Sequence, residues 1–270
     1  MKKTKNDRSL RFYHEVLGLE RLHYGLWHEN DPFTIEGLKS AQVRYEDMLI
    51  ERIPTGAVQV LDVGCGTGVM SSRIKAAGYE VEGLSPDVNQ EHPYKEKVDQ
   101  PFHLCRFEHF TGEGRYDCII MSESSQYIKL PLLFETAFKA LKPGGSLMIC
   151  DYLVKDDVTG VLAKSGHCET AFRSAARAGG FRLVAEEDIT DATVKTLDLA
   201  MDAVRRIRLG FEIATEKSRK RHPRLFLVGA WLLRKKVARA ERQLALLDSA
   251  AFKKHKKYGY FLFQAVAENS

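Results

Sequence analysis

Residues 60–68 read VLDVGCGTG, and this stretch decides the fold. A short β-branched run, 58–63, leads into three glycines with the spacing G-x-G-x-G, and a helical pattern then continues to about Ala77. Glycine lets the backbone turn sharply and approach a ligand closely, and the first turn of a helix has free N–H groups. The stretch therefore predicts a buried strand, a ligand-binding turn and a helix.

The spacing and charge around these glycines indicate the kind of ligand. A dinucleotide fold uses G-x-G-x-x-G for a pyrophosphate, but here the third glycine comes one residue early and residue 69 is valine. Asp62 lies two residues before the first glycine. A carboxylate at that place suits a cationic amino group better than a pyrophosphate, because opposite charges attract. An NAD-dependent oxidoreductase is therefore the least favoured interpretation.

The chain alternates between helical and strand-like patterns. Gly78 is expected to end the helix after the glycines in a left-handed conformation. Further helices are predicted at 34–52 and 132–141, and strands at 79–84, 101–105, 116–122, 146–152, 181–186 and 258–266. This alternation predicts an α/β fold with a parallel sheet and crossover helices.

A helical insertion lies between the last two predicted strands, with helical patterns over 190–220 and 224–247. We expect it to form a cap over the carboxyl edge of the sheet, where open α/β sheets bind ligands. Residues 216–257 hold fourteen Lys or Arg against three acidic residues, whereas the whole chain has a net charge of +5. This basic segment is either a solvated helical face or a contact surface for an anionic membrane, an acidic substrate or nucleic acid.

The composition excludes several classes of protein. The chain has 270 residues, of which 44% are hydrophobic and 29% charged, as in a folded protein with one large domain or one domain and a cap. No stretch approaches the ~20 apolar residues of a membrane-spanning helix, and no apolar secretory leader follows the charged N-terminus. The five cysteines form no C-x-x-C pair, so neither a disulfide framework nor a zinc site is expected. These features predict a reduced, cytoplasmic location, with peripheral membrane contact as a variant of it.

Residues 60–68 resemble motif I of class I S-adenosylmethionine-dependent methyltransferases, and LKPGG at 141–145 resembles the segment before a later strand in that family. The resemblance implies a Rossmann-like, mostly parallel sheet of seven strands with the helical cap inserted between the last two. It implies S-adenosylmethionine as cofactor and S-adenosylhomocysteine as product. Together with the helix and strand patterns, it predicts a helical N-terminal segment at 1–55, the cofactor-binding core at 56–188, the cap at 189–257, and the final strand and tail at 258–270.

One branch of that family, which contains the cyclopropane synthases and the tocopherol and sterol C-methyltransferases, is similar over roughly residues 12–152. Residues 83–90, GLSPDVNQ, are similar to its G-[IL]-T-x-S-x-x-Q pattern, in which the Thr and the Gln hold the ribose. The resemblance therefore implies ribose contacts from Ser85 and Gln90, with Asp87 as the rival.

Two further segments are similar to this branch. Phe107 and Glu108 resemble the aromatic and acidic pair that flanks the adenine, where the ring stacks on the base and the carboxylate accepts from its amino group. HYGLW at 23–27 resembles the segment that closes over the methionine end of the cofactor, and Tyr24 matches the tyrosine there. Trp27 either lines the substrate side or anchors a helix. The predicted cofactor-binding residues are Tyr24, Asp62, Gly64, Gly66, Gly68, Ser85, Gln90, Phe107, Glu108 and Ser122.

The residues after the predicted strand at 116–122 are the main candidates for catalysis. In the cyclopropane synthases a glutamate there binds bicarbonate, but the matching position is Gln126, which argues against cyclopropanation. Transfer to oxygen or nitrogen is helped by a base, whereas transfer to an alkene needs a group that stabilises a carbocation. The predicted catalytic residues are Glu123, Tyr127 and His23, with His28 as a weaker alternative. No cluster of His, Cys and acidic residues has metal-ligand spacing, so no metal is expected.

The acceptor is predicted only by class. The family branch and the segment 224–243, which joins an apolar half to a basic half, favour a small lipophilic acceptor such as a lipid or an isoprenoid-like molecule. A polar metabolite methylated on oxygen or nitrogen is the alternative. RNA held by the basic residues of 216–257 comes next, but these residues are interleaved with apolar rather than exposed aromatic ones, so we expect no nucleic-acid partner. A non-catalytic cofactor-binding protein is the remaining alternative.

Overall fold

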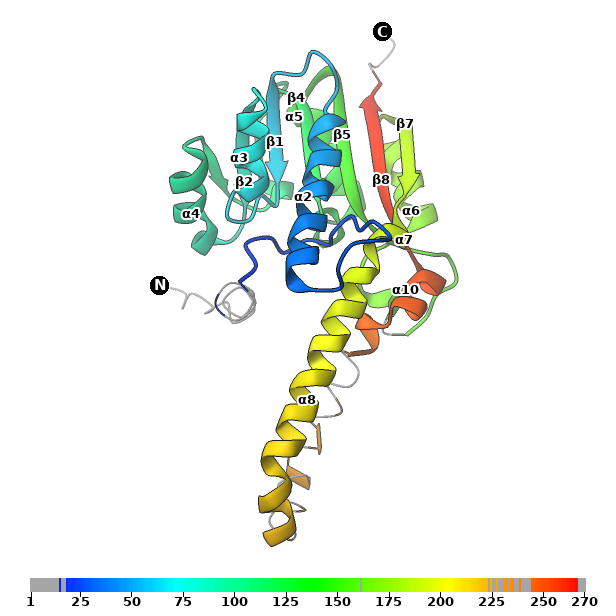
Figure 1. The fold of residues 1–270 in the computed structure, drawn as a ribbon. Coiled ribbons are helices and arrows are strands. Elements are labelled where there is room, and N and C mark those ends of the chain that lie inside the picture. Colours follow the sequence, from blue (N-terminus) through cyan, green and yellow to red (C-terminus); the bar gives the residue numbers. More distant parts are fainter. Residues whose placement is uncertain are drawn as a thin grey trace.

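The computed structural model describes residue 15, residues 18–160, 162–222 and 244–266, and isolated positions between 223 and 243. Its core is one sheet with the strand order β3-β2-β1-β4-β5-β8-β7, and the short β6 pairs with β5 (Figure 1). The strands are β1 Gln59–Val63, β2 Glu80–Ser85, β3 Phe102–Leu104, β4 Tyr116–Ser122, β5 Leu141–Val154, β6 His167–Cys168, β7 Phe181–Asp188 and β8 Lys256–Ala265. All pairs are parallel except that β8 runs antiparallel to both β5 and β7. The predicted mostly parallel sheet is confirmed, with β6 as an additional short strand.

Helices lie on both faces of this sheet (Figure 1). One apolar cluster includes side chains of α5 Leu130–Ala140, α6 Glu169–Ala178 and the 3-10 turn η2 Phe107–His109. The other includes side chains of α2 Ile35–Glu51, α3 Val69–Ala76, α4 Val88–Val98 and α10 Ser249–His255. The remaining helical elements of the described residues are α7 Thr190–Thr193, α8 Lys195–Arg221, η3 Ser125–Tyr127, η4 Leu162–Lys164 and η5 Ala245–Leu247.

Strand β4 separates the two clusters. Ile119 and Met121 belong to the cluster with α5 and α6, whereas Cys118 and Ile120 belong to the cluster with α2 and α3. Successive side chains of a strand point to opposite faces, so a strand covered on both faces is apolar throughout. Complete burial of each large apolar side chain contributes about 1.5–3 kcal/mol, and this strand therefore fixes the centre of the sheet.

The carboxyl ends of β1, β2 and β4 meet at one edge, because these strands are neighbours and parallel. β1 ends at the glycine turn, residues 64–68, and β4 ends at Ser122. Gly78 has φ +98° after α3, which is the left-handed conformation that the sequence predicts for it. The edge therefore gathers the loops in which we expect the site.

The N-terminal segment 19–27 runs against this edge. Trp27 is 5% exposed, and its Nε1–H donates to Thr196 Oγ1 at 2.8 Å. The Leu26 N–H donates to the Ala41 carbonyl of α2 at 2.8 Å. Trp27 therefore anchors the segment between α2 and the start of α8, which decides between its two predicted roles.

The insertion between β7 and β8 begins with α7 and α8. Figure 1 shows α8 leaving the carboxyl edge and projecting away from the sheet. Near its start Leu199 packs with Leu19 and Leu38, whereas further along Ile207 and Phe211 are 62% and 68% exposed. The first turns of α8 therefore border the edge of the sheet. The second predicted helix, 224–247, lies mostly outside the described residues, and the cap stays a prediction.

Across the ranges described, no helix combines the length and the apolar character that a membrane span requires.

Candidate cofactor-binding and active site

The turn between β1 and α3 holds three glycines with left-handed φ values of +83° at Gly64, +57° at Gly66 and +81° at Gly68. A Cβ atom on Gly64 would lie 2.5 Å from Ser124 Cβ, and one on Gly68 would lie 2.6 Å from Val98 Cγ2. A Cβ atom on Gly66 would meet no atom within 4 Å. Packing therefore requires the first and third glycines, whereas Gly66 leaves the backbone open to a ligand.

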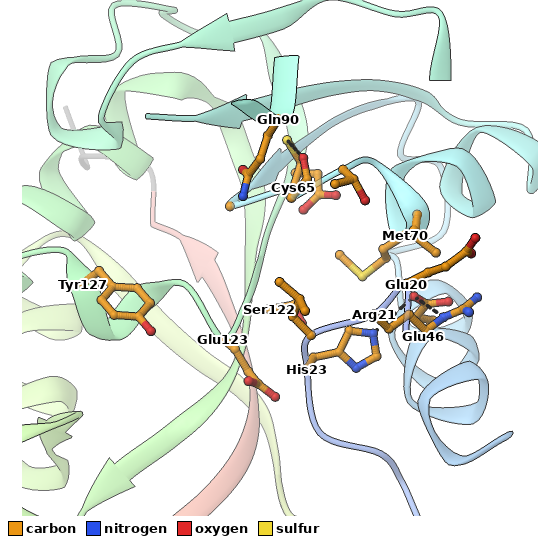
Figure 2. A pocket seen from close by; sticks show the side chains of 16 residues that line it. Glu20, Arg21, His23, Glu46, Cys65, Met70, Gln90, Ser122, Glu123 and Tyr127 are labelled. Carbon is orange, nitrogen blue, oxygen red and sulfur yellow. Dashed lines mark hydrogen bonds and ion pairs between the residues drawn. The ribbon is translucent and has the colours of Figure 1, made fainter. Parts of the chain in front are cut away.

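A cavity of about 240 Å³ lies beside this turn (Figure 2). Its wall combines segment 19–27, α2, the glycine turn, α4 and the loop after β4. Of the predicted site residues, the cavity is lined by His23, Asp62, Gly64, Gly66, Gln90, Ser122, Glu123 and Tyr127. The fold thus brings together most of the residues that the sequence analysis selected from four separate segments.

Asp62 lies deep in this wall. Its side chain is buried, and its Oδ2 accepts a hydrogen bond from Ser71 Oγ of α3 at 2.6 Å. Burial raises the pKa of Asp62 to about 7, because desolvation disfavours the charged carboxylate. A cation placed in the cavity would favour the charged form again, so this position is suited to an amino group.

Gln90 and Ser85 form a hydrogen-bonded pair, and Gln90 lies close to Cys65 of the glycine turn in Figure 2. Ser85 Oγ donates a hydrogen bond to Gln90 Oε1 at 2.6 Å, and Gln90 lines the cavity. The rival residue, Asp87, caps α4 by accepting from the Asn89 N–H at 2.9 Å. A carboxylate used as a helix cap is less available to a ligand, so the geometry favours Gln90, oriented by Ser85.

Phe107 and Glu108 do not line this cavity. The Phe107 ring is 2% exposed and packs in the core cluster with Leu84. Glu108 forms an ion pair with Arg106 at 2.6 Å. Their contacts with the adenine stay a prediction.

Glu123 is a tightly held carboxylate at the edge. Its φ of +52° is left-handed, which is rare for a residue with a side chain and is typical of functional sites. Its Oε1 accepts from the Tyr24 backbone N–H at 2.7 Å and from the Tyr258 hydroxyl at 2.6 Å. Burial raises the pKa of Glu123 to about 7. A carboxylate with this pKa can take up and release a proton near neutral pH.

His23 is held at both ring nitrogens. Nδ1 lies 2.8 Å from the Tyr24 carbonyl and Nε2 lies 3.2 Å from Glu46 Oε1, while the ring stacks on Tyr45 at 4.6 Å. Glu46 is completely buried and also pairs with Arg73 at 2.7 Å. The geometry therefore assigns His23 to holding segment 19–27 against α2 and leaves it little freedom to act as a base.

The other predicted residues take different places. Tyr127 is 74% exposed and lies across the cavity from His23 in Figure 2. Ser122 lines the cavity and its Oγ lies 3.0 Å from the Tyr45 hydroxyl. The Tyr24 ring packs on Tyr258, with 5.4 Å between ring centroids, and lies outside the cavity wall. His28 is exposed and also lies outside this wall.

Several residues of the site were not predicted from the sequence, among them Arg21, Glu46 and Tyr258. Arg21 lines the cavity, where its Nε donates to Glu46 at 2.9 Å, and Tyr258 holds Glu123. Arg21 and Glu46 stand in segments without a motif, so no local signal marks them. Tyr258 begins the aromatic run YGYFLF, in which one functional hydroxyl cannot be told from core residues. Within the part of the chain that the structure describes, no group of His, Cys and acidic residues could hold a metal ion.

The model of a family described as a methyltransferase domain matches residues 38–192. The chain belongs to this family. The match confirms the predicted class I S-adenosylmethionine-dependent methyltransferase, together with its enzyme class and the cofactor of that family.

Curated relatives match this methyltransferase over part of their length. Ubiquinone biosynthesis O-methyltransferase of Rattus norvegicus is 26% identical over 156 residues, which cover 50% of this chain and 45% of the relative. Phosphoethanolamine N-methyltransferase 3 of Arabidopsis thaliana is 31% identical over 164 residues, which cover 54% of this chain and 33% of the relative. The match therefore spans less than half the length of either relative.

Solved structures share the fold over nearly the whole chain. A putative sarcosine dimethylglycine methyltransferase from Galdieria sulphuraria has a TM-score of 0.72 at 18% identity, covering 96% of this chain and 99% of that chain. Geranyl diphosphate C-methyltransferase from Streptomyces coelicolor has a TM-score of 0.70 at 15% identity, covering 97% and 94%. The predicted Rossmann-like fold is confirmed by these likenesses.

Proposed function

We propose that this methyltransferase transfers a methyl group from S-adenosylmethionine to a hydroxyl group of a small lipophilic acceptor. The observation that carries the proposal is the position of Glu123. This carboxylate stands on the wall of the glycine-turn cavity, is fixed at one oxygen, and has a pKa of about 7.

The residues of the cavity fit the cofactor. Gly66 leaves the backbone open, Asp62 suits the amino group, and Gln90 suits the ribose hydroxyls. When bound, S-adenosylmethionine supplies a methyl group attached to a positively charged sulfur. A nucleophile can bond to this methyl carbon, and the sulfur is the leaving group. The work left to the protein is to orient the acceptor, exclude water and remove a proton.

Glu123 has the properties of the group that receives this proton. Its Oε1 is held by Tyr24 and Tyr258, and among the described residues Oε2 has no hydrogen-bond donor. The acceptor's O–H bond would break as its oxygen forms the new bond to carbon, and the proton would pass to Glu123. A base with a pKa near the working pH does this most effectively.

An apolar groove supports the lipophilic class of acceptor. The groove has a volume of about 520 Å³ and lies between segment 19–27, α2 and the first turns of α8. It is lined by Leu19, Leu22, Leu38, Leu199, Val204 and Ile207, together with Tyr24, whose N–H binds Glu123. An apolar chain in this groove would gain about 25 cal/mol for each Å² removed from water, and it would lie next to the residue that holds the base.

Two arguments support a hydroxyl as the group that is methylated: the role of a carboxylate base, and the names of similar proteins. A hydroxyl acceptor gives up its proton as the new bond forms and so needs a base at that step, whereas an alkene gives up a proton only after its carbocation has formed. Two relatives at 26% and 30% identity are ubiquinone biosynthesis O-methyltransferases. A relative at 31% identity is a phosphoethanolamine N-methyltransferase, so the amine is the alternative that the test includes.

We further propose peripheral membrane contact through the distal part of α8. Leu209, Phe211 and Ile213 are 57–68% exposed there, and the last turn carries Arg219, Lys220 and Arg221. Apolar and basic side chains together favour an anionic lipid surface. Cosedimentation with vesicles that contain anionic lipid tests this contact, and equal recovery with neutral vesicles would argue against it.

The experiment for the main proposal is formation of S-adenosylhomocysteine with a series of catechols that carry alkyl chains of increasing length. Phosphoethanolamine serves as the polar amine, and Glu123→Gln as the control for the base. We expect kcat/KM to rise with chain length and little product from the amine. Equal turnover of catechol and long-chain catechols, or turnover of the amine alone, would contradict the proposed acceptor.

A further inference from the structure

A chain of hydroxyl groups leads away from Glu123 into the protein. The Tyr258 hydroxyl, on β8, lies 2.6 Å from Glu123 Oε1 and 3.2 Å from the Tyr45 hydroxyl of α2. The Tyr45 hydroxyl in turn lies 3.0 Å from Ser122 Oγ, which returns the chain to the cavity wall. Residues from β4, α2 and β8 are thus joined behind one carboxylate.

The hydroxyl groups of Tyr258 and Tyr45 stay protonated and can donate hydrogen bonds. Both side chains are completely buried, and burial raises the pKa of Tyr45 and of Tyr258 well above the ordinary value. Each phenol therefore keeps its single proton. The shorter contact and the charge of the acceptor direct the proton of Tyr258 to Glu123, because hydrogen bonds to ionised groups are the stronger ones.

Tyr258 acts on the side of Glu123 that is turned from the acceptor. Because Oε1 receives both the Tyr24 N–H and the Tyr258 hydroxyl, it has little capacity left for a third donor. The second oxygen, Oε2, is then the one available to a hydroxyl in the cavity. Without Tyr258 the carboxylate would have one anchor and could rotate about its side-chain bonds.

We propose that Tyr258 is a positioning residue of this enzyme: its hydroxyl fixes Glu123 Oε1, so that Oε2 is presented to the acceptor, an inference that rests on the role proposed above for Glu123. Tyr45 supports Tyr258 in this arrangement through the 3.2 Å contact.

The charge state of Glu123 depends on more than Tyr258. His23 of segment 19–27 lowers its pKa, whereas Asp151 of β5 raises it. The titratable groups that face Glu123 are His23, Tyr45, Tyr127, Cys150, Asp151, Tyr152 and Tyr258. Among them the Tyr258 hydroxyl donates directly to the carboxylate and lowers its pKa, so its removal should raise that pKa further.

The test is infrared titration of the Glu123 carboxyl group in the cofactor-free protein. Difference spectra between each protein and the same protein with Glu123→Gln isolate this one group. Tyr258→Phe is the test variant, and Tyr260→Phe is the matched control, because Tyr260 is a buried tyrosine of the same strand and the same apolar cluster. Tyr45→Phe serves as a second test variant should Tyr258→Phe not fold.

We expect Tyr258→Phe to raise the midpoint of the Glu123 titration by about one pH unit, Tyr45→Phe to raise it by less, and Tyr260→Phe to leave it unchanged. An unchanged or lowered midpoint in Tyr258→Phe, or in Tyr45→Phe where the former does not fold, would overturn the inference. Calorimetric binding of S-adenosylhomocysteine to the wild-type protein is measured in parallel. Its absence would contradict the proposed function, whereas the titration reports on Tyr258 independently of the cofactor.

Discussion

The Tyr24 backbone N–H donates a hydrogen bond of 2.7 Å to Glu123 Oε1, across 99 positions of the sequence. This bond ties segment 19–27 to the loop after β4. A donor to the charged form lowers the pKa of a carboxylate, so the packing of segment 19–27 bears directly on the base proposed here. The segment therefore contributes to the chemistry as well as to the wall of the cavity.

Glu123→Gln should lower turnover about 10²- to 10⁴-fold, because the amide cannot accept the acceptor's proton. Binding of S-adenosylhomocysteine should stay unchanged, since the proposed contacts of the cofactor lie elsewhere in the cavity. Steady-state rates measure the loss of turnover, and calorimetry measures the binding of S-adenosylhomocysteine. Glu135→Gln on α5, which removes an exposed carboxylate paired with Lys139, is the control for loss of charge. Wild-type turnover in Glu123→Gln would remove this residue from the mechanism.

Gly66→Val should abolish cofactor binding and leave the protein folded. The new side chain would meet no protein atom at its Cβ but would fill the space beside the turn. Its φ of +57° adds strain of about 1–2 kcal/mol. Gly56→Val is the matched control, because Gly56 has φ +88° and open space at its Cβ but lies away from the cavity. Equal cofactor affinity in the two variants would show that Gly66 does not border the ligand.

Cofactor affinity should fall as the pH falls below about 7. The folded pKa of Asp62 is about 7, above its ordinary value, so the free protein binds a proton there at lower pH. The cationic amino group requires the ionised form, and affinity should decrease by about tenfold for each pH unit below the pKa. Calorimetry with S-adenosylhomocysteine across this range measures the slope. Asp62→Asn should bind S-adenosylhomocysteine weakly and without this pH dependence, whereas Glu123→Gln should keep the pH dependence. A pH dependence that persists in Asp62→Asn would argue against Asp62 as the group that binds the amino group.

Ala203→Trp should block the apolar groove. Ala203 lines the groove from α8, and an indole there would take the space of an alkyl chain. We expect KM for a long-chain catechol to rise about tenfold, which corresponds to about 1.4 kcal/mol, with cofactor binding unchanged. Arg205→Trp is the control, because Arg205 is exposed and lies outside the groove. Equal effects of the two substitutions would indicate a general disturbance of α8.

The fold could be predicted where local patterns were strong. The apolar run of β4 and the glycine turn after β1 fix the centre of the sheet, and both stand as predicted. α4 was not predicted, because its eleven residues are mostly polar and include Pro93. The path of α8 away from the sheet depends on which apolar side chains find partners, and a helical pattern does not contain that information.

Part of the site could be predicted from the order and direction of the strands. Asp62 lies among the last residues of β1, and Gln90 and Glu123 follow the ends of β2 and β4, so the topology alone brings them to one edge. The burial of Phe107 could not be predicted, because a ring beside a cofactor and a ring in the core have the same sequence signal. Tyr258 and Tyr45 reach Glu123 from β8 and α2, and such contacts between distant segments follow only from the tertiary structure.

The turn at residues 64–68 is expected to hold S-adenosylmethionine, and every role proposed for the site depends on it. The decisive measurement is calorimetric titration of the wild-type protein with S-adenosylmethionine and, separately, with NAD. We expect micromolar binding of S-adenosylmethionine, no binding of NAD, and loss of the signal in Gly66→Val. Absence of S-adenosylmethionine binding, or binding of NAD in its place, would show that the turn serves another ligand.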